Sequence, residues 1–505
     1  MNKIKKKISN NQKILIVSCL WIVFFGSLNS KWNYSPLQYN FVELFNLFRF
    51  ILLYSLPIIV YGYFLFIKNY DFNHNIILYS LYLYSFCQLL GFANFYFFNP
   101  DLFEEISNKE FLAINGYNLR FSYSFFTGIC LILPIPLIAL IISNKDYLRN
   151  IFYLSIIILT IITIIYSTRI LYEWIIYDNK SYLYWLPYLT WGTFLDMPAP
   201  RSTGISRWYL ILFIALISYF VTQKSRFDYK IFLLLIFLGA VVYLFQSRTS
   251  VYFLIISTLI LFLKNQSFLK NFFSIICLLL FIFLSSKGIV KLKLSLSVYS
   301  INKDVKILQN VISDLEDKSK STKEEKYKPD IDNTKNEVEK LKDKIDNIKI
   351  NEKKTRNLGH DDNFSTGRLE IWTELSEYIF KTKLSNFIFG YGSQADRYLV
   401  TQNASNGLFY ILITSGFLGL IFFIIIYLKL LNILINLFNN RFIIQDKKIF
   451  KFHHLSSLML ILFFSFRMLV ENSISIFGLD YLFFLISVAT LFNLNLNIKN
   501  NLYKK

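Results

Sequence analysis

Apolar runs long enough to cross a membrane recur along this chain of 505 residues, of which 54% are hydrophobic and only 17% are charged. About eighteen consecutive apolar residues make a candidate helical span, far more than the core of a soluble protein needs. Aromatic residues make up 19% of the chain, which suits lipid-facing surfaces and interfacial belts. The sequence therefore predicts an all-α, polytopic integral membrane protein.

About twelve spans are expected, with ends placed to within several residues. They lie near residues 14–29, 48–67, 75–98, 122–143, 150–168, 207–222, 230–246, 250–264, 271–286, 406–431, 454–470 and 474–495. The shorter, Trp-rich stretch Leu183–Leu195 is expected at the interface or as a re-entrant piece. The basic N-terminus is followed by no small-residue cleavage site, so the first span is expected to be retained.

The distribution of Lys and Arg between the short loops predicts the orientation of the spans. Basic residues precede the first span and recur in alternate loops, for example at Lys224–Lys230 and Arg441–Lys451. Both termini are therefore expected in the cytoplasm, and the long loop 287–405 outside. This divides the chain into a bundle of about nine helices over 1–286, the loop 287–405, and C-terminal membrane helices over 406–505.

The first half of the long loop has a helical repeat. Apolar residues follow one another at spacings of three and four: Ile301, Val305, Leu308, Ile312 and Leu315, then Val338, Leu341, Ile345 and Ile348. A polar break containing Pro329 separates the two sets. This pattern predicts two helices folded back as an antiparallel coiled-coil hairpin over 301–350. The hairpin contains no His, Cys, Trp or Arg, which favours a structural insert or partner-binding arm over a catalytic role.

The second half of the loop, 356–405, has a different composition. It holds His360 beside two aspartates, then Arg368 and Trp372 at the start of an expected surface helix, and a Gly-Tyr-Gly turn at 390–392. Catalysis is expected in this segment.

The arginines are unevenly distributed, because ten of the thirteen fall outside or at the outer boundary in this topology, against the positive-inside tendency. The planar guanidinium grips phosphate through two parallel hydrogen bonds, which Lys cannot match. A substrate that carries pyrophosphate at the outer leaflet would explain the bias.

Four of these arginines lie at the ends of spans. Arg201 and Arg207 flank a Ser-Thr-Gly turn that leads into a helix, where backbone N–H groups favour an anion. Arg248 occupies a tight turn between two spans, and Arg467 ends a span one turn before Glu471. Each alone is explained as well by an interfacial anchor or an ion pair; Arg201, Arg248 and Arg368 together favour an anion-binding site.

Several motifs in order resemble the O-antigen polymerase and O-antigen ligase family of bacterial envelope enzymes. They are the Pro-Arg-Ser-Thr-Gly turn at 200–204, Ser247-Arg248, Arg368-Leu-Glu-Ile-Trp372, Gly390-Tyr-Gly392, Ser405-Asn406-Gly407-Leu408 and Gly416-Phe-Leu-Gly419. The resemblance runs from about residue 200 to 475. It implies a glycosyltransferase of the type C fold in the bacterial inner membrane, with the large loop in the periplasm. The implied donor is an undecaprenyl-pyrophosphate-linked glycan.

The motifs and the arginines at span ends together give expected roles for individual residues. Arg368 would act in catalysis. The pyrophosphate or the glycan would be bound by Arg201, Arg248, Trp372 and Asn406, which lie in the motifs, and by Arg207 and Arg467, which lie at span ends. Ligases of the family carry His-Asn where this chain has Ser405-Asn406, and that His is a proposed base. Here His360 and Glu471 are the candidate general bases, and the missing His favours polymerase over ligase.

Other functions remain open at this point. An O-antigen ligase would transfer the glycan to lipid A core, and a flippase would move single lipid-linked units. No cofactor is expected, and no metal site, because the four cysteines all lie in apolar runs. Expected partners are membrane lipid, the lipid-linked oligosaccharide and chain-length regulators or other polysaccharide assembly proteins. The net charge of +20 reflects Lys residues next to the spans, which set the orientation and contact anionic lipid, and it does not indicate nucleic-acid binding.

Overall fold

The computed structural model is helical throughout the part of the chain that it describes. That part comprises residues 76–102, 145–176, 202–223, 228–245, 247–263, 267–322, 328–353, 368–381, 383–400, 406–439, 450–471 and 478–502, with isolated positions between them. No strand occurs within these ranges. The expected all-α class is confirmed for them. The stretch Leu183–Leu195 lies outside the described residues.

Six of the described helices are long and apolar enough to cross a membrane. They are α3 (Ile76–Phe98), α7 (Lys145–Ile176), α8 (Ser202–Thr222), α11 (Phe268–Thr322), α16 (Gly407–Asn439) and α19 (Leu479–Leu502). Three shorter apolar helices accompany them: α9 (Tyr229–Leu244), α10 (Arg248–Thr258, continued by a 3₁₀ turn at Leu259–Leu263) and α18 (Phe452–Met468). The chain is thus a polytopic membrane protein. The expected spans 14–29, 48–67 and 122–143 lie outside the described ranges apart from isolated positions, so the count of twelve stays a prediction.

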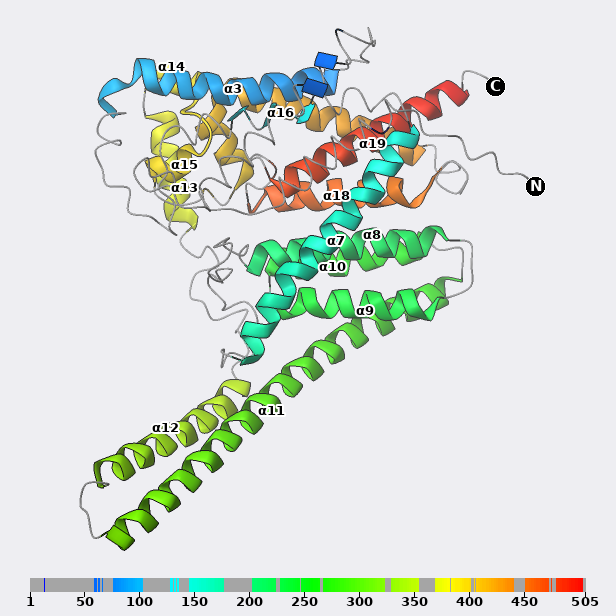
Figure 1. The fold of residues 1–505 in the computed structure, drawn as a ribbon. Helices are drawn as coiled ribbons and strands as arrows, with labels where there is room; N and C mark the ends of the chain where they lie inside the picture. The colour runs from blue at the N-terminus through cyan, green and yellow to red at the C-terminus, as the bar shows by residue number, and fades with distance from the viewer. Residues whose placement is uncertain are drawn as a thin grey trace.

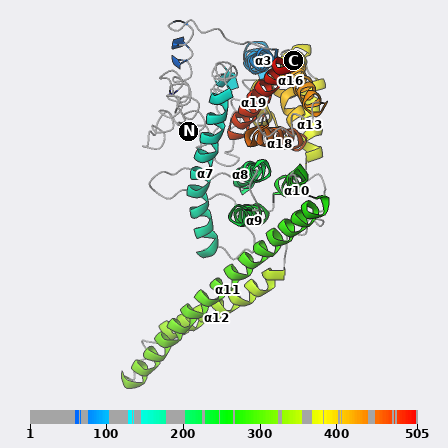
Figure 2. The ribbon, with the colours of Figure 1, turned by 90° about the vertical axis from the view of Figure 1, so that its right-hand side faces the viewer.

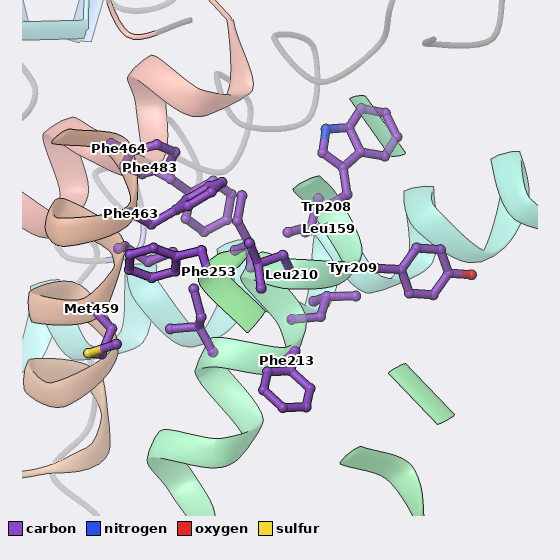
Figure 3. Packing of buried hydrophobic residues seen from close by; sticks show 14 of the residues in the cluster. Leu159, Trp208, Tyr209, Leu210, Phe213, Phe253, Met459, Phe463, Phe464 and Phe483 are labelled. Atoms are coloured by element: carbon purple, nitrogen blue, oxygen red, sulfur yellow. The ribbon is translucent and has the colours of Figure 1, made fainter. Parts of the chain in front are cut away.

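The core of the bundle lies where α7, α8, α10, α18 and α19 meet (Figure 3). Large apolar side chains interdigitate there, and the Phe253 and Phe463 ring centroids are 5.1 Å apart. Buried serines let these helices approach closely, and some bond back into their own helix, as Ser257 Oγ does to the Leu254 carbonyl (2.8 Å). A rigid scaffold therefore holds the helix ends that carry the arginines.

Two antiparallel helices, the distal part of α11 and α12 (Lys328–Lys353), occupy the residues expected to form the hairpin and extend away from the bundle at a slant (Figures 1 and 2). Their packing as a coiled coil in a periplasmic loop stays a prediction. Ile301, Val305, Val338 and Ile345 from the predicted repeat are buried between or beside them. A 2.8 Å ion pair joins Lys335 Nζ to Glu316, and this carboxylate raises the pKa of Lys335.

The first helix of the hairpin is not a separate element. α11 runs without a break from Phe268 to Thr322, through the boundary expected near residue 287. At 1.5 Å per residue its 55 residues extend about 80 Å, well over twice the hydrocarbon thickness of a membrane. One helix therefore serves both as a membrane span and as one arm of the hairpin.

Candidate functional site

Several helix ends that carry the predicted site residues meet at one end of the bundle (Figure 1). α8 and α10 begin there, α18 ends there, and α16 and α19 begin there. The short helices α13 (Arg368–Phe380), α14 (Leu384–Phe389) and α15 (Ala395–Leu399) lie against α16 at this end. The second half of the long loop is thus brought to the same face as the arginines of the bundle.

Two of the predicted arginines take part in a buried charge cluster. Arg207 Nη1 of α8 donates a hydrogen bond to Asp480 Oδ2 at the start of α19. Arg467 Nη2, in the last turn of α18, donates to Glu471 Oε2, and Arg467 Nε lies 3.9 Å from the same Asp480 oxygen. The Arg467 side chain is 0% exposed and that of Asp480 5%. Burying these cations is tolerated because carboxylates accompany them.

The cluster combines two cations with two carboxylates, so its members balance in formal charge. Arg207 and Glu471 remain partly exposed, at 21% and 27% of their side-chain surface, whereas Arg467 and Asp480 are enclosed. Arg207 and Glu471 thus form the outer part of the cluster.

Arg248 is placed differently from the paired arginines. It is the first residue of α10, and its Nε is buried without a hydrogen-bond partner among the described residues. A helix N-terminus carries unsatisfied backbone N–H groups and a partial positive charge. The guanidinium and the helix end together favour an anion at this position.

Asn406 joins α16 to α18 next to the charge cluster. Its side-chain oxygen accepts hydrogen bonds from the backbone N–H groups of Leu408 (2.8 Å) and Phe409 (3.2 Å), which caps α16. Its side-chain nitrogen donates to the Leu469 carbonyl at the end of α18 (3.0 Å). A Cβ on the next residue, Gly407, would collide with Met468. The Asn-Gly pair therefore packs the two helix ends against each other.

Trp372 positions the segment that leads to Asn406. Its indole Nε1 donates to the Ala404 carbonyl (2.8 Å), and its ring stacks on Phe409 with centroids 5.6 Å apart. The Ala404 N–H in turn donates to Asp396 Oδ2 (2.8 Å), a carboxylate that is fully buried. Ala404 is thus held on both sides, two residues before Asn406.

The Gly-Tyr-Gly turn fills a kink in α16. Gly416 has φ 63° and interrupts the helix, which leaves carbonyl groups of the preceding turn without their usual partners. The N–H groups of Tyr391 and Gly392 donate to the carbonyls of Ile413 (2.9 Å) and Thr414 (2.8 Å). The turn thereby satisfies the kinked helix and fixes α14 and α15 to it.

The remaining predicted site residues are described only in part. Arg368 is the first residue of α13, but its side chain is not among the described parts of the structure. Arg201 and His360 lie outside the described residues altogether. The roles assigned to all nine predicted site residues stay predictions. Asp480 and Asp396 were not predicted as site residues. Each is a buried aspartate in the first turn of a helix, and only its contacts in the folded structure reveal its importance. Within the described residues no group of His, Cys, Asp and Glu could hold a metal ion.

Comparison with known proteins gave a match to a family model. Neither a search of curated proteins nor a search of solved structures gave a match. Residues 232–424 match the family model Wzy_C, described as O-antigen ligase. The matched range starts in α9 and ends in α16, so it contains Arg248, Trp372 and Asn406 but neither Arg207 nor Arg467. The resemblance expected from the motifs is thereby confirmed over residues 232–424, which are similar to the O-antigen ligase family.

Proposed function

We propose that the protein polymerises undecaprenyl-pyrophosphate-linked oligosaccharide repeat units into O-antigen or a related surface polysaccharide at the periplasmic face of the bacterial inner membrane. The observation that carries this proposal is Arg248, whose buried Nε has no partner among the described residues and which starts a helix. Such a position suits the phosphate of a lipid-linked donor. The family match supports a reaction on lipid-linked glycans.

The reaction exchanges one bond at the anomeric carbon of the donor glycan. A hydroxyl of the acceptor unit attacks this carbon, the bond to the pyrophosphate oxygen breaks, and undecaprenyl pyrophosphate leaves with the electron pair. The hydroxyl proton passes to a base. Arg248, with Arg201 and Arg368, would stabilise the charge that develops on the leaving group.

The charge cluster supplies one candidate base. Glu471 is 27% exposed, whereas Arg467, which pairs with it, is enclosed. An acceptor hydroxyl would therefore reach the Glu471 carboxylate and pass its proton to it. His360 is the second candidate base. Trp372 and Asn406 would shape the glycan side of the site through the Ala404 segment.

Ser405 favours a polymerase over a ligase, because ligases of the family carry His before this Asn. O-antigen ligase, which transfers the chain to lipid A core, is the alternative that the description of the family model favours. Analysis of the lipid-linked glycans that accumulate in a deletion strain decides between them. Single repeat units on the carrier at the periplasmic face support a polymerase, whereas long chains left on the carrier would establish a ligase. Single units that stay at the cytoplasmic face would instead indicate a flippase.

The phosphate-binding role is tested by Arg248→Lys, which keeps the charge and removes the bidentate fork. Loss of polymer at normal protein level is expected. Arg149→Lys is the matched control, because Arg149 is exposed near the start of α7 and pairs only loosely with Asp146 (3.6 Å). Full polymer from Arg248→Lys would contradict the proposal.

A further inference from the structure

An apolar ridge on α11 continues past the end of its membrane-spanning portion. Side chains 3, 4, 7 or 11 residues apart lie on one face of a helix. The ridge consists of Phe281, Leu284, Leu292, Leu296 and Tyr299. All five side chains are exposed. From Leu284 to Tyr299 the ridge adds about 20 Å to the lipid-facing part of the helix.

The opposite face of α11 is occupied, which fixes the direction in which the ridge points. Leu294 is buried, and Lys293 Nζ lies 5.6 Å from the ring centroid of Trp174 in α7. Further along, Ile301 and Val305 are buried in the hairpin, where α12 packs. By contrast Leu292 is 62%, Leu296 47% and Tyr299 72% exposed. The ridge therefore faces away from both the bundle and α12.

We propose that the outer part of this ridge, Leu292, Leu296 and Tyr299, lies in the acyl and headgroup region of the leaflet where α11 leaves the membrane. The base of the hairpin then rests on the lipid instead of standing free in water. Continuity with Phe281 and Leu284, the exposed apolar residues on the same face of the membrane-spanning portion, favours lipid over a protein partner. In Figure 1 α11 is inclined to α8 and α9, so its residues advance more slowly along the direction of those helices than in a parallel helix.

The residues around the ridge have the chemistry of an interfacial segment. Tyr299 is the outermost of the three, and Tyr is enriched at the headgroup level of membranes. Lys287 and Lys291 are exposed beside the ridge, where their amines can reach lipid phosphates while their stems cover apolar surface. Lys287 Nζ lies 5.6 Å from the Phe283 ring centroid, which holds this cation close to the helix.

Photocrosslinking of the full chain tests the contact. Leu296 or Tyr299 is replaced by p-benzoyl-phenylalanine, and the protein is irradiated in vesicles of phosphatidylethanolamine and phosphatidylglycerol. Leu284 is the reference within the span, and Glu339, exposed on α12, is the control. Because the replaced side chains are exposed, the substitutions leave folding intact.

Lipid adducts at Leu296 and Tyr299 as abundant as at Leu284, with none at Glu339, are the expected result. Absence of lipid adducts at both positions would overturn the proposal, and so would a crosslink between two copies of the chain, since that would make the ridge a dimer interface. The double variant Lys287→Gln, Lys291→Gln is expected to lower the share of phosphatidylglycerol among the adducts to its share in the vesicle. An unchanged share of phosphatidylglycerol among the adducts would show that Lys287 and Lys291 do not bind the lipid headgroups.

Discussion

Asp480 at the start of α19 accepts a hydrogen bond from Arg207 near the start of α8, although 273 positions separate the two residues in the chain. The same carboxylate oxygen lies 3.9 Å from Arg467 Nε. One carboxylate thus bridges two arginines from two helices. Its loss would leave two cations close together with Glu471 as their only described counter-charge.

Asp480→Asn is expected to destabilise the protein strongly. Removing one partner of a buried ion pair costs about 3–5 kcal/mol, because the other charge remains buried. Thermal unfolding of the purified protein in detergent measures the effect. Asp146→Asn is the control, since its exposed pair with Arg149 is worth about 0–1 kcal/mol. Equal melting temperatures for the two variants would show that Asp480 does not support the cluster.

The hydrogen bond from Trp372 to Ala404 gives a second prediction. Trp372→Phe keeps the stacking on Phe409 but loses the indole N–H, so the carbonyl of Ala404 is released. Polymer synthesis is expected to fall while the protein level stays normal, because Ala404, two residues before Asn406, loses one of the two hydrogen bonds that hold it. Thr373→Ala on the same helix is the control, as its hydroxyl bonds only to the Leu369 carbonyl among the described groups. Normal polymer synthesis by Trp372→Phe would show that the hydrogen bond from the indole N–H to Ala404 is not needed for the reaction.

Gly416→Ala is expected to prevent normal folding of the loop onto α16. The backbone of Gly416 (φ 63°, ψ −167°) is in a region that essentially only Gly adopts, which costs another residue about 1–3 kcal/mol. A Cβ would also lie 2.6 Å from Phe389 N, with the Ile388 carbonyl closer still. Gly288→Ala is the contrasting change, because no atom lies within 4 Å of its Cβ position and Ala favours a helix by about 1 kcal/mol. Membrane protein levels and protease sensitivity distinguish the two. A protease-resistant Gly416→Ala protein would show that the kink is dispensable.

The hairpin was predictable because its signal is local. The spacing of Ile301 and Val305, and of Val338 and Ile345, marks one buried face on each helix, and these four residues are buried in the structure. The continuity of α11 was not predictable from the same signal. Lys287 and Gly288 end the apolar run, which resembles the end of a span, although both amino acids fit within a helix.

The candidate site could be predicted only in part, because its contacts join residues far apart in the chain. Charge and position at span ends indicated Arg207, Arg248 and Arg467. Nothing in the periodicity indicates which carboxylate meets them, so Asp480 was missed. The Gly-Tyr-Gly turn was recognised as a motif, but its bonds to Ile413 and Thr414 depend on a kink that no local pattern specifies.

Shortening the hairpin tests whether its distal part takes part in the reaction. Glu316 pairs with Lys335. In an antiparallel pair of helices, Ile312 and Glu339, each four residues nearer the base of the hairpin, therefore lie at about the same level. Removal of Ile312–Glu339, with a short Gly-Ser turn in their place, therefore keeps the register of the remaining helices and leaves the α11 ridge intact. Polymer synthesis is expected to continue at the normal rate, because the removed residues contact none of the described site residues.

Polymer length distribution and protein level are both measured in the shortened variant. Ile345→Asp in the full-length chain is the matched control, because it buries a charge in the face that meets α11 and opens the hairpin without shortening it. Loss of synthesis in the shortened variant at normal protein level would place the distal hairpin in the reaction itself. A changed length distribution at an unchanged rate of synthesis would instead indicate that the distal hairpin binds a partner that sets chain length. If Ile345→Asp changed the length distribution in the same way, this partner would need the two helices to be paired.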